Sequence, residues 1–209
     1  VHQSYGRAYQ LPQTTAYNES CATIGFVLWA WRMLALTGDG RYADEIERVL
    51  LNSLPAMIGA EGSSYFYTNP LRQVRALPYQ LRRAGDPAGS PPPASEARLR
   101  QEYMTNCFCC PPNFARTIAE LPYYVFSTGP DLLWVHQFVG ATASLMLGSV
   151  PVSVEMATRY PAQGTVRIRV RAAEPVRGTV RVRVPGWAPE TVVTVEGEPV
   201  ATVERGYAV

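Results

Sequence analysis

The chain has 209 residues, with an ordinary apolar content of 47% and a low charged content of 17%. It is therefore too long for a disulfide-stapled miniprotein and long enough for one large or two modest domains. A formal net charge of +2 excludes the strong positive field typical of proteins that bind nucleic acid or anionic membranes, so we expect neither partner. No run of about eighteen apolar residues is present, and we expect no membrane-spanning helix.

The first predicted elements are two helices joined by a short turn. An apolar pattern that starts near residue 20 and stops at the Gly-Asp-Gly turn of residues 38–40 predicts a long helix, buried on most sides. A second helix is predicted over residues 41–54, with Asp44 and Glu45 in its first turn, where they would complement the helix dipole. The short turn predicts that the two helices form an antiparallel hairpin.

The middle of the chain contains a loop and a third helix. Residues 84–93 are so rich in glycine and proline that we expect an exposed insertion there. A helix is predicted over residues 113–126, directly after two prolines that suit a first helical turn. Phe114 and Ile118 would lie on its apolar face, and Pro122 would kink it near its end.

The pattern changes at about residue 130, after which short strands alternate with turns. Five strands are predicted, over residues 132–135, 143–147, 152–156, 166–171 and 180–184. In the last two, arginine alternates with apolar residues, which is typical of the solvated face of an antiparallel sheet. The chain is therefore of mixed class and multi-domain, helical over residues 1–128 and an antiparallel β-sandwich over residues 130–209.

The four cysteines suggest a metal site. Cys107, Cys109 and Cys110 fall within four positions, and Cys21 lies far upstream, two residues after Glu19. Adjacent cysteines would need two separate disulfide partners in a crowded place, so metal binding is favoured, with a metal-free disulfide protein as the alternative. Thiolates suit zinc, and one glutamate with three cysteines would complete a tetrahedral Zn²⁺ site, with Cys107 a competitor for the third sulfur position.

Such a site has two interpretations. Four protein ligands leave no open position for water, which is typical of a structural zinc that joins two distant segments. A closed site can still be reactive when one ligand is itself the nucleophile, since a zinc-held thiolate is deprotonated at neutral pH.

Three stretches of the sequence resemble a known enzyme family. Residues 17–25, 65–71 and 107–116 are similar to the signature stretches of glycoside hydrolase family 127, whose best-known members are β-L-arabinofuranosidases. Residues 182–187 resemble part of the family's sandwich, so the resemblance covers nearly the whole chain.

The resemblance implies a fold and a ligand set. Residues 1–128 would be the C-terminal half of an (α/α)6 barrel, followed by a β-sandwich that is incomplete at its C-terminus. Glu19, Cys21, Cys109 and Cys110 match the family's zinc ligands, and Cys109 matches the nucleophile of a retaining double displacement.

The resemblance also marks a departure in the acid/base position. The family's general acid/base glutamate falls at Gln3 here, and the glutamine amide does not titrate. His2 and Tyr5 are nearby residue types that could take that role, and His2 is also a candidate for hydrogen bonding the substrate. Tyr67 matches a substrate-contacting tyrosine, with Tyr65 as the alternative.

These observations predict a zinc-dependent retaining glycoside hydrolase that acts on L-arabinofuranosides or related plant-type glycosides. The alternative is a catalytically impaired carbohydrate-binding homologue with a structural zinc. We expect a carbohydrate as partner, and a homodimer is one option for the assembly. The first residue is valine and the last residues read as a strand cut short, so we expect the chain to continue at both ends.

Overall fold

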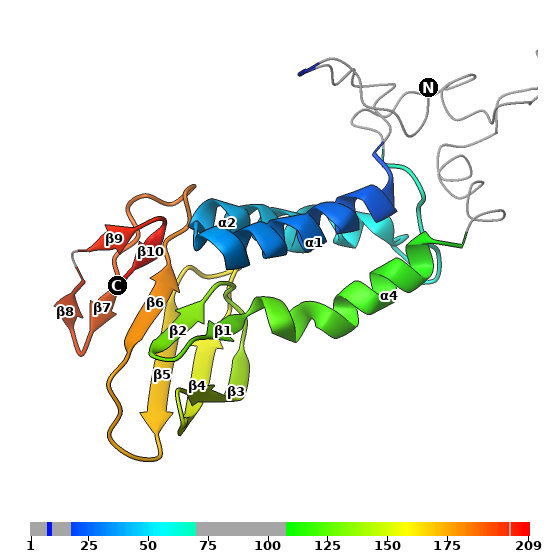
Figure 1. The fold of residues 1–209 in the computed structure, drawn as a ribbon. Coiled ribbons are helices and arrows are strands. Elements are labelled where there is room, and N and C mark those ends of the chain that lie inside the picture. Colours follow the sequence, from blue (N-terminus) through cyan, green and yellow to red (C-terminus); the bar gives the residue numbers. More distant parts are fainter. Residues whose placement is uncertain (1–7, 10–17, 70–107, 201) are drawn as a thin grey trace, which may run out of the picture. The chain divides into compact units, whose positions relative to one another are not determined.

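The structure is a computed structural model that describes residues 8–9, 18–69, 108–200 and 202–209 (Figure 1). Its residues form two compact units. The first comprises the described parts of residues 1–28 and 48–118, and the second comprises residues 29–47 and 119–209. The predicted loop at residues 84–93 lies outside the described residues.

The helical elements follow the predicted order, with different ends. The chain forms helix α1 (Ser20–Thr37), helix α2 (Gly40–Arg48), the π-helical turn η1 (Val49–Ser53), the 3₁₀ turn η2 (Pro55–Met57), helix α4 (Cys110–Glu120) and the 3₁₀ turn η4 (Leu121–Tyr124). The second predicted helix thus changes to a π turn before Pro55. The third starts three residues earlier than predicted and tightens to a 3₁₀ turn at Pro122, where the ring removes a helical donor.

Helix α1 is less buried than predicted. One stripe is buried, formed by Ile24, Val27, Ala30 and Leu34. On other sides Trp29 is 50% exposed and Leu36 is 80% exposed, so the prediction of burial on most sides was wrong. By length and composition alone α1 could cross a membrane, but the core helix of a soluble protein passes the same test.

Helix α2 begins after a capping residue. The backbone N–H of Arg41 donates to Asp39 Oδ1 at 3.1 Å, which satisfies one donor of the first turn. The first turn itself contains no acidic residue, because the helix starts at Gly40 and places Asp44 and Glu45 in its second turn. The predicted dipole role of these two residues was therefore wrong, and Asp44 has a different partner.

In the described part of the chain, the β strands form two larger sheets and one small hairpin. A five-stranded sheet has the order β1-β2-β6-β10-β9, a three-stranded antiparallel sheet has the order β3-β4-β5, and β7 pairs with β8. The strands are β1 (Phe126–Thr128), β2 (Leu132–Val135), β3 (Ala141–Leu147), β4 (Val150–Thr158), β5 (Val166–Ala172), β6 (Thr179–Arg183), β7 (Thr194–Val195), β8 (Glu198–Pro199), β9 (Val203–Glu204) and β10 (Tyr207–Ala208).

One strand pair corrects the predicted antiparallel sandwich. Strands β2 and β6 pair in parallel, with Leu132 opposite Thr179. Parallel neighbours need a long connection, and residues 136–178, which include the whole three-stranded sheet, supply it. The two sheets share one hydrophobic cluster, which contains Val125, Val135 and Met156 packed against Phe126, Phe138, Val166, Ile168 and Val182.

The arginines of strand β5 behave as predicted. Arg169 and Arg171 are exposed and lie 3.3 and 3.6 Å from Glu155 on the neighbouring strand. Such exposed ion pairs contribute little to stability, about 0–1 kcal/mol. They form the solvated face of the three-stranded sheet.

Arg183 at the end of strand β6 contradicts that pattern, because its side chain is fully buried. Its Nη1 lies 2.6 Å from Asp44 Oδ1, its Nη2 pairs with Glu47, and its Nε donates to the carbonyl of His136 at 2.5 Å. The indole Nε1 of Trp187 also donates to Glu47 Oε1 at 3.0 Å. We call Arg183, Asp44 and Glu47 the arginine cluster; it joins helix α2 to the five-stranded sheet.

A buried histidine lies beside the arginine cluster. His136 Nε2 is 2.7 Å from Ser127 Oγ, and its Nδ1 is 2.7 Å from the hydroxyl of Tyr207. Burial, with the nearby Arg183 charge, lowers the pKa of His136 to about 3, so this ring is neutral at neutral pH.

Candidate metal centre

Four side chains from two distant segments meet in the first unit. One ligand atom each from Glu19, Cys21, Cys109 and Cys110 lies within 4.8 Å of the other three. Cys21 Sγ is 3.4 Å from Cys110 Sγ, Cys109 Sγ is 3.7 Å from Cys110 Sγ, and Cys109 Sγ is 3.9 Å from Glu19 Oε1. Cys21, Cys109 and Cys110 form no disulfide with one another in the described part of the chain. The structure thus brings together the four residues that the resemblance implied; we call them the cysteine cluster.

The upstream half of the cluster is held by an extended segment. Glu19 forms an antiparallel bridge with Thr68, and the backbone N–H of Ser20 donates to the carbonyl of Tyr67 at 2.9 Å. The Ser20 hydroxyl donates to the carbonyl of Phe66 at 2.6 Å. Ser20 is buried at the start of α1, so these bonds fix the direction in which the helix presents its first turn.

The downstream half of the cluster is the start of helix α4. The carbonyl of Cys109 accepts the first helical hydrogen bond, from Asn113 N–H at 3.2 Å, and Cys110 is the first helical residue. Cys110 and Thr117 form the buried face, whereas Ile118 is 44% exposed. The predicted apolar face was therefore wrong at Ile118, since the buried residues of α4 are a cysteine and a threonine. Free N–H groups at a helix start favour negative charge on these thiols.

The surroundings of the cluster disfavour an ionised Cys110 thiol. Cys110 is 2% exposed, and Cys21 and Cys109 are half-buried. Burial above all, then the neighbouring Cys21 and Cys109, raises the pKa of the Cys110 thiol well above its usual range. With no cation, the group stays protonated at neutral pH. A bound metal ion would reverse that balance by stabilising the thiolates.

Two tyrosines lie next to the cluster. Tyr67 is 4% exposed and packs with Cys110, and Cys21, Tyr65 and Cys109 pack against that pair. The ring of Tyr65 meets Phe114 edge-on at a centroid distance of 5.7 Å. A substrate contact by Tyr67, with Tyr65 as the alternative, stays a prediction.

One neighbour of the cluster was not singled out from the sequence. Asn113 Nδ2 lies 3.0 Å from Cys21 Sγ. Its position three residues after Cys110 places both on one side of α4, and that spacing is the signal that could have identified it.

The other predicted site residues, Gln3, His2, Tyr5 and Cys107, lie outside the described residues. Their roles stay predictions.

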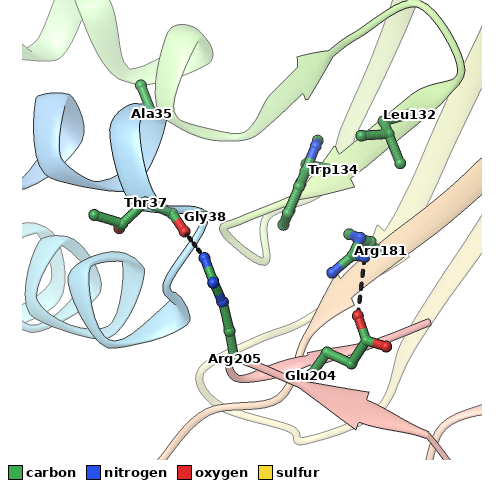
Figure 2. Close-up of a pocket in the computed structure, with 8 residues that line it drawn as sticks. All are labelled: Ala35, Thr37, Gly38, Leu132, Trp134, Arg181, Glu204 and Arg205. Atoms are coloured by element: carbon green, nitrogen blue, oxygen red, sulfur yellow. Dashed lines mark hydrogen bonds and ion pairs between the residues drawn. The ribbon is translucent and has the colours of Figure 1, made fainter.

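A pocket of about 690 Å³ lies in the second unit (Figure 2). It is lined by Ala35, Thr37, Gly38, Leu132, Trp134, Arg181, Glu204 and Arg205. Arg181 lies over the Trp134 ring and its Nη2 is 3.0 Å from Glu204 Oε2, while Arg205 Nη1 donates to the Thr37 carbonyl at 2.6 Å. The charged groups of the pocket thus interact with neighbouring protein groups. No residue of the cysteine cluster is among the residues that line this pocket.

Family models match both parts of the chain. Residues 1–123 match the model described as the glycoside hydrolase family 127 catalytic domain of β-L-arabinofuranosidase, and residues 132–209 match the corresponding middle domain.

Relatives and solved structures agree with those matches. A non-reducing end β-L-arabinofuranosidase of Bifidobacterium longum is 32% identical over 99% of this chain and 30% of the relative. A family 127 β-L-arabinofuranosidase structure from Geobacillus stearothermophilus is 35% identical, covering 94% of this chain and 30% of its own, with a TM-score of 0.78. A structure described as a glycoside hydrolase is 37% identical over all of this chain and 33% of its own, with a TM-score of 0.82. The chain thus spans about a third of the length of these proteins.

Proposed function

The chain belongs to glycoside hydrolase family 127, and from that premise we propose that it is part of a zinc-dependent retaining hydrolase of β-L-arabinofuranosides or related plant-type glycosides. The single observation that carries the proposal is the cysteine cluster, in which one carboxylate and three thiols converge. The arabinofuranosidase activity is taken from the names of the relatives, and this chain spans about a third of their length.

The cluster dimensions fit a tetrahedral zinc ion. Sulfur ligands about 2.3 Å from such an ion lie about 3.8 Å apart. Two of the sulfur separations are 3.4 and 3.7 Å, the Cys109 sulfur is 3.9 Å from the Glu19 carboxylate, and all four ligand atoms lie within 4.8 Å of one another. Zinc binds thiolates, whereas magnesium and calcium bind oxygen ligands. Three sulfur donors therefore favour zinc over these two ions. Glu19, Cys21, Cys109 and Cys110 would hold the ion.

Zinc would keep the thiols ionised at neutral pH, and the protein would decide which of them reacts. Cys110 is 2% exposed and packs with Tyr67, so reagents cannot approach its sulfur. Cys109 is half-buried at the cap of α4, and its sulfur faces the Glu19 carboxylate. Because Cys109 also occupies the position that matches the family's nucleophile, it is the nucleophile in this proposal.

The reaction would proceed by two displacements. The Cys109 sulfur attacks the anomeric carbon, the glycosidic C–O bond breaks, and the leaving oxygen takes a proton. Water then attacks the same carbon, the C–S bond breaks, and the proton from that water goes to a base. Two inversions give net retention of configuration.

The proton donor is the part of the mechanism in which this chain departs from its family. At the acid/base position Gln3 would hydrogen-bond the leaving oxygen without protonating it. His2 and Tyr5 are the nearby groups that could transfer the proton, and His2 is also the candidate substrate contact.

The proposed domain organisation follows from the same family. Residues 1–128 would form the C-terminal half of an (α/α)6 barrel, and residues 130–209 a β-sandwich. Support comes from the two family-model matches, which meet between residues 123 and 132.

Trapping of the nucleophile tests this proposal. The intact protein would be incubated with an L-arabinofuranose-configured haloacetamide, and the modified residue mapped by mass spectrometry. Labelling at Cys109 is expected, with no labelling in Cys109→Ser and little by a D-glucose-configured reagent. Labelling at a different residue, or equal labelling by both reagents, would show that Cys109 is not the nucleophile.

A second candidate is a carbohydrate-binding homologue with a structural zinc, and Gln3 is the observation that favours it. The variant Gln3→Glu separates the two. If the site lacks only its acid, this variant gains hydrolysis of an aryl β-L-arabinofuranoside, whereas the parent protein binds the same glycoside without hydrolysing it.

A further inference from the structure

Asn113 contacts the cysteine cluster from the first turns of helix α4. Its Nδ2 lies 3.0 Å from Cys21 Sγ. Its own backbone is fixed, because its N–H donates to the Cys109 carbonyl and its carbonyl accepts from the Thr117 hydroxyl at 2.8 Å. We propose that Asn113 is a positioning residue that donates a hydrogen bond to the Cys21 sulfur, so that Cys21 stays a structural ligand while Cys109 reacts.

The chemistry of the contact supports a donor role toward a charged sulfur. An asparagine amide nitrogen has two N–H donors and no accepting lone pair, and the amide does not change charge with pH. A hydrogen bond to a thiolate stabilises the charge on sulfur and reduces its nucleophilicity. The role rests on the metal site of the proposed function, because a bound metal ion would hold Cys21 as a thiolate.

The three sulfurs then differ in their surroundings. Cys110 is shielded by burial, Cys21 accepts from Asn113, and the Cys109 sulfur lies 3.9 Å from Glu19 Oε1. Burial limits access to the Cys110 sulfur, and the Asn113 amide would stabilise the charge on the Cys21 sulfur. Both effects would lower the reactivity of these two ligands.

Helix formation does not explain why an asparagine occupies this position. Asparagine is a weaker helix former than leucine, because its side chain competes for backbone hydrogen bonds. If Asn113 only supported the helix, Asn113→Leu would leave the chemistry of the cluster unchanged. If Asn113 acts as a donor, Asn113→Leu should change the reactivity of the cluster. This one variant therefore distinguishes the two explanations.

The test uses the intact, zinc-loaded protein and its Asn113→Leu variant, with metal content measured first. Each is treated with iodoacetamide, and the ratio of modified Cys21 to modified Cys109 is measured by mass spectrometry. Loss of metal to a chelator is followed in parallel. We expect the ratio to rise, and metal loss to be about tenfold faster, since outer contacts of metal ligands have effects of that order.

The matched control is Asn52→Leu, the same substitution at an exposed asparagine of η1 in the same unit, and it should match the parent protein. If Asn113→Leu does not fold, Asn113→Asp keeps the shape, removes the donor and should act in the same direction. A folded, zinc-loaded variant with the parent ratio and the parent metal loss would overturn the role of Asn113 alone. A parent protein without bound metal would overturn the proposed metal site as well.

Discussion

The cysteine cluster and the arginine cluster are both groups of polar side chains from distant segments, yet they are balanced differently. In the arginine cluster, the guanidinium of Arg183 supplies the positive charge that pairs with the carboxylates of Asp44 and Glu47. The cysteine cluster contains one carboxyl and three thiols, all anionic when ionised. A cluster with its own counter-charge can stay ionised inside the fold, whereas thiols and a carboxyl that share one sign of charge would stay ionised together only with an ion from outside.

Removal of metal should have the largest effect, and only on the cysteine cluster. We expect a strong chelator to lower the stability of the first unit by several kcal/mol, because metal-binding free energy adds to folding free energy. Unfolding followed by circular dichroism, with and without chelator, measures the change. An equal loss of stability in a variant with Cys21, Cys109 and Cys110 all changed to serine would show that the chelator acts elsewhere.

Removal of the cation from the arginine cluster should be the next largest effect. Arg183→Met leaves Asp44 and Glu47 without their cation, and breaking a buried pair in this way costs about 3–5 kcal/mol. Denaturant unfolding of the zinc-loaded protein gives the value. Arg169→Met on strand β5 is the matched control and should cost no more than about 1 kcal/mol, because its ion pair is exposed. A similar loss of unfolding free energy in both variants would contradict the distinction between the buried and the exposed ion pairs.

Acid should act on the second unit through His136. Its folded pKa of about 3 is below the ordinary value of 6.5, so the unfolded chain binds more protons between these two values. Stability is therefore complete above about pH 6.5 and falls as the pH decreases toward 3, by about 1.4 kcal/mol per unit from this one group. Unfolding between pH 7 and 5 should show this slope, and His136→Gln should reduce it. An unchanged slope in the variant would mean that other groups cause it.

The smallest effect should come from the edge of the arginine cluster. Trp187→Phe removes one of the donors to Glu47, and because the side chain is already 63% exposed, little apolar burial is lost. We expect a loss of about 1 kcal/mol in the free energy of unfolding, the value of one hydrogen bond. Tyr123→Phe, at a residue that is 71% exposed, should change almost nothing. A Trp187→Phe variant as stable as the parent would show that Glu47 is satisfied without the indole.

The two clusters also show what the sequence can and cannot predict. The cysteine cluster was predictable, because clustered cysteines are rare and the stretches around them resemble a family. The arginine cluster was not: Arg183 follows the same alternation as Arg169, and only the parallel β2–β6 pairing and the position of α2 bury one and expose the other. Asn113 was missed although it lies three residues after Cys110, because that spacing places it near the cluster without indicating its partner Cys21, which lies 92 positions away.

The most direct test of the metal site is X-ray absorption at the zinc edge of the purified intact protein. The account predicts one zinc per chain with three sulfur ligands at about 2.3 Å and one oxygen ligand at about 2.0–2.2 Å, and loss of one sulfur in Cys109→Ser. A site with four sulfurs would place Cys107 in the position given to Glu19. Absence of zinc would contradict the account at its centre.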